Sequence, residues 1–153
     1  MSVFKKMNLK PDQISEIVVL NAPESFESEL SLLEGVEIAR SIGDVEKIHY
    51  GLAFVITQAE LDEASEAMAA KTEGDVMLWF AYPKKSSKKY TCEFDRDSGW
   101  DKIGAAGFEP VRMVAIDQDW SALRFRRVEY IKSLKRSNKM AISAEGKKRT
   151  QKR

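Results

Sequence analysis

Short hydrophobic runs alternate along the chain with segments whose apolar residues recur at helical spacing. Turn-forming residues end most of the runs, and their length and composition are typical of strands. Residues 75–82 are the most continuously apolar, so we expect them to form a central strand that is buried on both faces. The pattern predicts strands at 14–20, 36–40, 48–56, 75–82, 110–116 and 120–126, and helices over 23–35, 58–71 and 98–107.

The connections restrict how these strands can be arranged. About seven residues join the second strand to the third, and such a segment spans at most about 25 Å when extended. It can cross one intervening strand but is too short to include a packed helix. The short turn at 117–119 predicts a closing antiparallel hairpin. The chain is therefore expected to be a Rossmann-like α/β domain with a mostly parallel sheet and a C-terminal antiparallel hairpin.

Composition agrees with one ordinary globular domain. Hydrophobic residues make up 43% and charged residues 32% of 153 residues. Cys92 is the only cysteine, which excludes an intramolecular disulfide and fits a reducing compartment. The N-terminus lacks the apolar run of a secretory signal, and charges interrupt every later apolar stretch. We therefore predict a cytoplasmic protein that does not enter a membrane.

The net charge of +1 conceals a division of the chain after Ile131. Residues 132–153 hold nine Lys and Arg against one acid, Glu145, whereas residues 1–131 hold 16 basic and 23 acidic side chains, a net charge of −7. The basic segment lacks an apolar stripe, so we expect a flexible tail beside one domain at 1–131. Such a tail can attract nucleic acid weakly, lie on the acidic domain or aid solubility.

Three separated motifs carry a family resemblance. They are VVLNAPE at 18–24, WFAYPKKS at 79–86, and GFEPVR at 107–112 continuing to WSALRFR at 120–126. Together they resemble a bacterial domain family of unknown function. The order of elements over residues 12–128 also resembles the S-adenosylmethionine-dependent methyltransferase fold in reduced form. This resemblance implies the fold and assigns no activity.

Ligands of open α/β sheets bind beyond the carboxyl ends of the strands. Three segments are expected at that edge, after the first strand, after the central strand and at the hairpin tip. The lysines there could attract an anion, or they could belong to a solvated loop. The candidate ligand-binding residues are Asn21, Glu24, Lys84, Lys85, Ser86, Asp117 and Asp119.

A nucleotide or S-adenosylmethionine site normally needs glycines after the first strand, where the backbone approaches the cofactor. This chain has side chains at those positions, and Pro23 also removes one helix N-terminal donor. We therefore expect S-adenosylmethionine to bind poorly and predict no bound cofactor and no metal site.

Other chemically capable residues have simpler interpretations. His49 has no partner in motif spacing and is expected to be an ordinary strand residue. Lys88 and Lys89 could lower the pKa of Cys92, yet no nucleophile signature surrounds this cysteine, and we expect it to be passive. Trp79, Trp100 and Trp120 are expected to pack in the core.

Two charged pairs remain. Asp117 and Asp119 could act as an acid and base, but aspartate commonly stabilises turns, and we favour that role. Arg124 and Arg126 should share a strand face and either form ion pairs or meet an anionic partner, of which ion pairing is preferred.

The sequence contains no complete catalytic or cofactor motif. It favours a non-catalytic domain that binds an anionic small ligand or a protein partner. The alternatives are an S-adenosylmethionine-dependent methyltransferase-like enzyme and weak nucleic-acid association through the basic tail.

Overall fold

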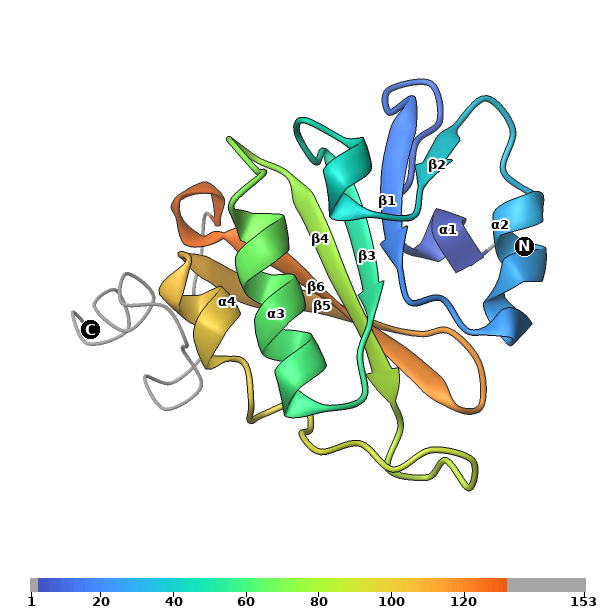
Figure 1. The fold of residues 1–153 in the computed structure, drawn as a ribbon, viewed down its shortest axis with the longest axis vertical. Coiled ribbons are helices and arrows are strands. Elements are labelled where there is room, and N and C mark those ends of the chain that lie inside the picture. Colours follow the sequence, from blue (N-terminus) through green and yellow to red (C-terminus); the bar gives the residue numbers. More distant parts are fainter. Residues whose placement is uncertain (1–2, 132–153) are drawn as a thin grey trace.

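The computed structural model describes residues 3–131, which form one six-stranded sheet flanked by short helices (Figure 1). The strands lie in the order β2-β1-β3-β4-β6-β5. Their bounds are β1 Glu16–Leu20, β2 Glu37–Ala39, β3 Tyr50–Phe54, β4 Met77–Pro83, β5 Phe108–Ala115 and β6 Trp120–Arg127.

The sheet has a parallel part and an antiparallel part. β2, β1, β3 and β4 run parallel to one another, whereas β6 pairs antiparallel with both β4 and β5. β2 and β3 lie on opposite sides of β1, so the short connection between them does cross one strand, as predicted. The predicted Rossmann-like sheet with a closing hairpin is confirmed.

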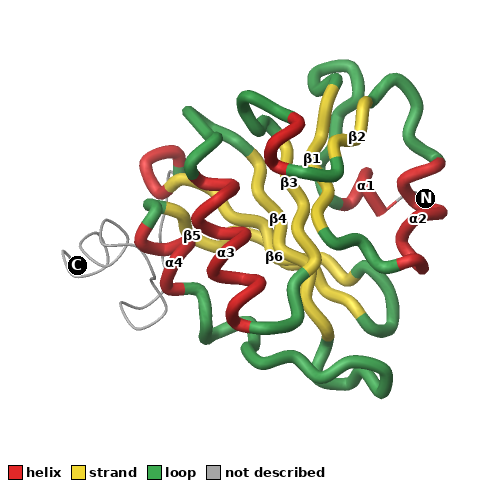
Figure 2. Tube along the Cα trace, viewed as in Figure 1, coloured by secondary structure: helices red, strands yellow, loops and turns green. Residues whose placement is uncertain are grey.

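Helices cover the two faces of the sheet unequally (Figure 2). On one face lie α3, Gln58–Ala69, and α4, Asp101–Ala105, and on the other lie α1, Val3–Lys6, and α2, Glu27–Ser31. β4 contributes to both hydrophobic clusters, because Leu78 and Phe80 pack on the α3 side and Trp79 and Ala81 pack on the opposite side. This strand is central and buried on both faces, as its continuous apolar run predicts.

Helix α3 begins at a capping box. The Thr57 hydroxyl accepts a hydrogen bond from the Glu60 amide at 3.1 Å, and the Glu60 carboxylate accepts one from the Thr57 amide at 3.0 Å. Helical spacing predicts Leu61, Ala64, Ala67 and Met68 on one face of this helix, and of these Leu61, Ala64 and Met68 are buried while Ala67 is half-buried. Together these features fix one helix against β3 and β4.

Two helical predictions need correction. The helix expected over 23–35 is divided into a 3-10 turn at Glu24–Phe26 and the five-residue α2; of the apolar residues at helical spacing in this range, Phe26 and Leu30 are buried and Leu33 is half-buried. Helix α1 was not predicted, because its four residues are too few to show a hydrophobic period. It nevertheless buries Val3 and Phe4 against the sheet.

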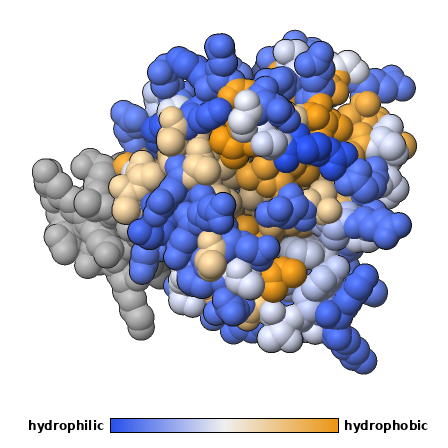
Figure 3. Space-filling model, viewed as in Figure 1, coloured by the Kyte–Doolittle hydropathy of each residue, from blue (hydrophilic) through white to orange (hydrophobic). Residues whose placement is uncertain are grey.

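On the α3 side of the sheet, Val18 of β1 is 1% exposed, although the connection nearby is short. In the connection from β2 to β3 only the 3-10 turn η2, Ile42–Asp44, lies on that side, and Figure 3 shows hydrophobic surface between η2 and α2. Among residues 3–131, no helix is long and apolar enough to cross a bilayer. The predicted basic tail at 132–153 lies outside the described residues.

Candidate functional site

The segment that leaves β4, residues 84–100, is a long loop fastened to the hairpin tip. The Lys84 amide donates to the Asp119 carbonyl at 2.8 Å, and the Ser87 hydroxyl donates to the Asp119 carboxylate at 2.8 Å. The amides of Lys89 and Tyr90 donate in turn to the Ser87 hydroxyl oxygen. One serine therefore sets the path of the first part of the loop.

Aromatic packing fastens the far end of the loop. Trp100 is 3% exposed, and its indole N–H donates to the Asp95 carbonyl at 2.8 Å. The Trp100 ring contacts four aromatic rings, those of Phe80, Tyr82, Phe94 and Phe125. These contacts hold the loop end on the α3 side of the sheet.

Helix α3 also supports this segment. The Gln58 amide, at the start of the helix, donates to the Glu93 carboxylate at 2.8 Å, and the Gln58 side chain donates to the Gly99 carbonyl at 2.8 Å. Gly99 has a φ of +97°, a left-handed conformation that favours glycine. The loop thus closes on the helix at a position where a side chain would be strained.

A cavity of about 530 Å³ lies between the loop, the end of β4 and the part of the hairpin nearest its tip, at Met113 and Ser121. Its size falls in the range of small-molecule sites, roughly 300–1,000 Å³. The lining mixes aromatic and aliphatic side chains with charged ones from both halves of the loop. Its residues are Tyr82, Pro83, Lys84, Lys85, Ser87, Tyr90, Thr91, Cys92, Glu93, Phe94, Asp95, Arg96, Ser98, Met113 and Ser121.

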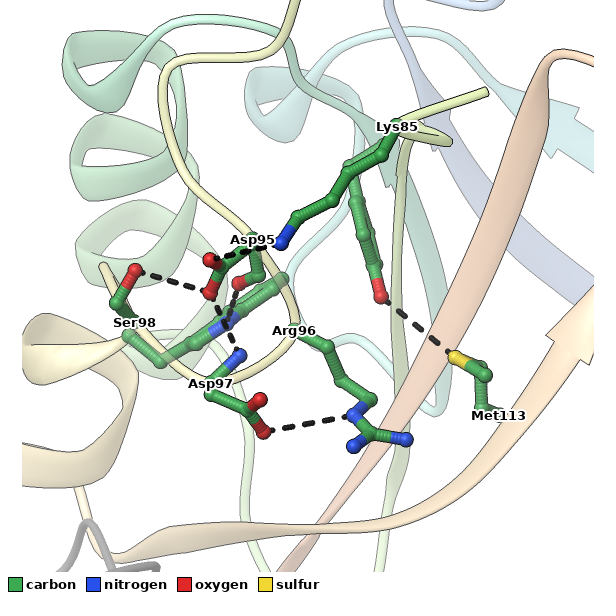
Figure 4. Close-up of polar contacts among 8 residues, drawn as sticks. Lys85, Asp95, Arg96, Asp97, Ser98 and Met113 are labelled. Carbon is green, nitrogen blue, oxygen red and sulfur yellow. Dashed lines mark hydrogen bonds and ion pairs between the residues drawn. The ribbon is translucent and has the colours of Figure 1, made fainter. Parts of the chain in front are cut away.

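The acidic and basic side chains of the cavity differ in how they are held (Figure 4). The Asp95 carboxylate accepts hydrogen bonds from the Asp97 amide at 2.9 Å and from the Ser98 hydroxyl at 3.0 Å. These bonds, the amide first, lower the pKa of Asp95. Lys85 lies 3.6 Å from the same carboxylate and its side chain is 85% exposed. Within residues 3–131, Lys84 has no ion pair.

Two groups of the cavity that could act as nucleophiles, the Tyr82 hydroxyl and the Cys92 thiol, keep their protons. Burial raises the pKa of Tyr82 to about 12, and its hydroxyl donates to the Met113 sulfur at 3.6 Å. Burial also raises the pKa of Cys92, contrary to the lowering that nearby lysines suggested. A thiol with a raised pKa is a poor nucleophile at neutral pH, which agrees with the predicted passive role.

The end of β1 is a tight, acidic turn. Asn21 has a φ of +58°, so it adopts the left-handed conformation that a glycine would otherwise supply. Its side-chain amide donates to the Phe54 carbonyl at 3.4 Å and links the ends of β1 and β3. Farther along, Arg40 binds Glu27 through two hydrogen bonds of 2.8 Å and joins β2 to α2.

The candidate residues from the sequence occupy three places along one edge. β1 and β4 are parallel, so their following loops lie at the same edge of the sheet (Figure 1). Lys84 and Lys85 line the cavity, and exposed Ser86 lies beside them without lining it. Asn21 and Glu24 lie in the β1 turn, outside the cavity lining.

The hairpin aspartates stabilise the turn, as preferred from the sequence. The Asp117 carboxylate accepts hydrogen bonds from the Asp119 and Trp120 amides at 2.8 and 2.9 Å. Asp119 holds Ser87 and so supports the cavity wall.

His49 is exposed and precedes β3, so its placement within a strand was wrong. In residues 3–131, no cluster of His, Cys, Asp and Glu is arranged to hold a metal ion.

Sequence reasoning missed most of the cavity wall. Tyr90, Arg96 and Met113 come from segments without a recognisable motif, and Met113 reaches the cavity only because the hairpin folds against β4. The length of the loop was the available signal, since connections longer than about 12–15 residues are uncommon and often functional.

Comparison with known proteins gives a likeness of fold. No family model and no curated protein matches the chain. Among solved structures it is similar to the Methanococcus jannaschii fibrillarin, a pre-rRNA processing protein, with a TM-score of 0.50 and 12% identity over 78% of this chain and 70% of that chain. The fold is therefore a mixed α/β, methyltransferase-like Rossmann fold.

Two further structures are more distant. LepI, solved in complex with SAM, gives a TM-score of 0.47 and 11% identity over 81% of this chain but only 38% of its own. The N-methyltransferase NodS from Bradyrhizobium japonicum gives 0.43 and 10% identity, over 74% of this chain and 86% of that one.

Proposed function

We propose that this protein is a non-catalytic Rossmann-like domain that binds an anionic small molecule in the cavity after β4. One observation carries the proposal. The cavity is lined by three cations: Lys84, which has no ion pair among the described residues, Lys85, 3.6 Å from Asp95, and Arg96, 3.4 Å from Asp97, while both lining carboxylates, Glu93 and Asp95, accept hydrogen bonds from the protein itself. Positive charge is therefore the charge left available to a ligand.

The shape of the site favours a small molecule over a protein partner. A concave site of about 530 Å³ can enclose a metabolite, whereas a protein partner needs a broader surface, typically about 800 Å² on each side. Phe94 and Met113 supply apolar contacts beside the cations. We infer a ligand with an anionic group and an apolar or aromatic part.

A binding role also suits the protonation of the lining residues. The raised pKa values of Tyr82 and Cys92 leave both groups neutral at physiological pH. The lining holds no histidine that could act as a general base. These groups can donate weak hydrogen bonds to a ligand but are poorly suited to attack it.

A thermal-shift screen of nucleotides, S-adenosylmethionine and phosphorylated metabolites tests the proposal, because a ligand selective for the folded state raises its apparent stability. We expect an anionic hit whose affinity falls at least tenfold in the double variant Lys84→Ala/Lys85→Ala and falls with salt. Stability of this variant should change by no more than about 0.5 kcal/mol.

The matched control is Lys88→Ala/Lys89→Ala, which removes the same charge from the same loop. These two lysines are exposed and do not line the cavity. Equal weakening by both double variants would indicate general attraction to the loop and would overturn the cavity as the site.

A methyltransferase-like enzyme is the second candidate, and the likeness of fold to fibrillarin supports it. Against it, Asn21 and the Glu27–Arg40 ion pair occupy the turn and strand end where a nucleoside cofactor would approach. We expect no S-adenosylmethionine binding at micromolar concentration by calorimetry. Micromolar affinity would instead favour the enzyme.

Nucleic-acid association through residues 132–153 remains a separate proposal, testable by deleting that segment.

A further inference from the structure

Three arginines meet on the face of the hairpin that is opposite to the cavity. Arg112 on β5 is the register partner of Arg124 on β6, and Arg126 follows two residues later on the same face. Leu123 and Phe125, which alternate with these arginines, pack in the cluster on the α3 side. The arginine face is therefore separate from the cavity.

Like charges in this arrangement are unfavourable. Residues directly opposite on antiparallel strands have Cβ atoms about 4.5–5.5 Å apart, and like charges at such positions destabilise a sheet. Burial first, and then the nearby charge of Arg126, lowers the pKa of Arg124. The pairing of β5 with β6 shifts register between Pro110 and Arg112, so this arginine pair lies directly beside a β-bulge.

Asp75 is the carboxylate that ion-pairs with an arginine of this face, and its charge also acts on Arg124. Asp75 binds Arg126 through two hydrogen bonds, of 2.8 and 2.6 Å, and so is already engaged. Glu109 is the register partner of Arg126, is fully buried and has an interaction of its own. Within residues 3–131, no hydrogen bond or ion pair is made by the side chains of Arg112 and Arg124.

Near these arginines, two buried N–H groups have no hydrogen-bond acceptor among the described residues. Arg124 is half-buried, and its Nε is buried without a hydrogen-bond partner in the described part of the chain. Trp79, which lies opposite Arg124 on β4, is 0% exposed and its indole N–H also lacks an acceptor there. Buried donors are nearly always satisfied, so the unpartnered Nε of the half-buried Arg124 indicates a place where an acceptor can bind, whereas the fully buried Trp79 cannot reach an external one.

We propose that Arg112, Arg124 and Arg126 form a second binding site, which takes the phosphate group of a ligand. Guanidinium groups present parallel N–H donors that match phosphate oxygens, and several together can surround a tetrahedral dianion. The phosphate neutralises the repulsion between Arg112 and Arg124 and supplies acceptors to the donor groups of the face. Asp75 holds Arg126 in position from the other side. This site is independent of the cavity after β4.

Calorimetric titration of the full chain with pyrophosphate tests this site. We expect binding that weakens at least tenfold in Arg112→Gln and in Arg124→Gln. Arg124→Lys should give an intermediate loss, since it keeps the charge without the guanidinium fork. Arg112 is exposed, so Arg112→Gln should fold even where the half-buried Arg124 variant does not. Absence of pyrophosphate binding to the unaltered protein overturns the proposal.

Two controls separate this site from the cavity and from general charge. The exposed-lysine variant Lys10→Gln should bind pyrophosphate as the unaltered protein does, and in Lys84→Ala/Lys85→Ala the Arg112-dependent part of the binding should remain. Loss in the lysine double variant with retention in the arginine variants would assign pyrophosphate to the cavity and overturn the arginine site.

The source of the phosphate can be distinguished in the same variants. A short single-stranded oligonucleotide whose binding requires Arg112 and weakens steeply with salt would identify a nucleic-acid backbone. Pyrophosphate binding without Arg112-dependent oligonucleotide binding would identify a small phosphorylated molecule. Both results support a phosphate site. Equal binding of both probes to all arginine variants contradicts it.

Discussion

The ends of β1 and β4 lie on the same edge of one sheet, yet they are built in opposite ways. After β1 the chain turns at once through Asn21 and continues into short helical turns that carry Glu24, Glu27 and Glu29. After β4 it makes a long basic loop that encloses a cavity of about 530 Å³. The comparison shows that, along one edge of a Rossmann-like sheet, the turn after the first strand can leave no room for a ligand while the loop after another strand encloses a cavity.

The physical difference lies in which groups are already satisfied. The Asn21 side chain and the Arg40 guanidinium are both engaged by the protein at the end of β1 and β2. At the end of β4, both cavity carboxylates accept hydrogen bonds from the protein, Lys85 is exposed, and the half-buried Lys84 has no ion pair among the described residues. A ligand gains most where donors lack a protein partner, which favours the β4 end.

The largest expected change in stability comes from a substitution at Gly99, in the loop that follows β4. A Cβ at this position would lie 2.7 Å from the Phe94 Cβ and 2.8 Å from the Gln58 side-chain oxygen, and the φ of +97° adds backbone strain. Gly99→Ala should therefore lower the free energy of unfolding by about 2 kcal/mol or more in urea. It should also abolish binding of any cavity ligand.

Gly43→Ala is the matched control for that substitution. A Cβ at Gly43 would meet only the Ser41 hydroxyl, at an ordinary 3.8 Å. We expect a change within about 0.5 kcal/mol. Equal urea midpoints for the two alanine variants would show that the loop end is not held as tightly as its contacts indicate.

A smaller effect is expected at the β1 end. Asn21→Ala places a residue that disfavours left-handed geometry at φ +58° and removes the bond to Phe54, so it should cost about 1 kcal/mol. Asn21→Gly should be nearly neutral, since glycine accepts this φ. Thermal melts of the two variants measure the difference.

Asn21→Gly also tests whether the Asn21 side chain alone prevents S-adenosylmethionine from binding at the end of β1. We expect it to gain no S-adenosylmethionine affinity by calorimetry, because Pro23 and the Glu27–Arg40 pair remain. A gain to micromolar affinity would mean that one side chain alone keeps the β1 end closed.

The smallest expected effect concerns the Glu27–Arg40 ion pair, which is exposed. The hydrogen bond from Arg40 lowers the pKa of Glu27 from 4.5. A carboxyl group whose pKa is lower in the folded state stabilises the fold above its unfolded pKa and loses that contribution as pH falls through the folded pKa. Glu27→Gln should lower the melting temperature slightly at pH 7, and the difference should shrink as the pH falls below 4.5 and vanish once it is below the lowered pKa of the folded state.

Glu34→Gln provides the comparison for this pH series, since Glu34 is an exposed carboxylate in the segment that follows α2. Its melting curve should track that of the unaltered protein at every pH. A pH-independent difference for Glu27→Gln would show that the carboxylate contributes through something other than this ion pair.

Much of the fold was predictable because its elements follow local rules. The apolar run of β4, the stripe of Leu61, Ala64 and Met68, and the turn-forming aspartates each reflect contacts that a short segment specifies. The length of the β2 to β3 connection also predicted the crossing of β1 correctly. Helix α1 was missed because tertiary burial of Phe4, rather than any local period, determines it.

The candidate site was predictable only in part, because it depends on distant packing. Lys84 and Lys85 were recognised from their place after a strand, and they do line the cavity. Arg96 enters it because Trp100 and Gly99 return the loop to the sheet, which no local pattern encodes. The preferred ion pairing holds for Arg126 with Asp75 but not for Arg124 among the described residues.

The place of β4 in the chain has a consequence during synthesis. Its edge pairs with β6, which is made some 40 residues later, so the most apolar strand leaves the ribosome with that edge unpaired. Exposed apolar strands of this kind aggregate unless charged residues flank them. Lys84, Lys85, Lys88 and Lys89 follow the strand directly. We expect these lysines to reduce aggregation of the nascent chain until β6 has been synthesised and has paired with β4, whichever ligand the folded loop binds.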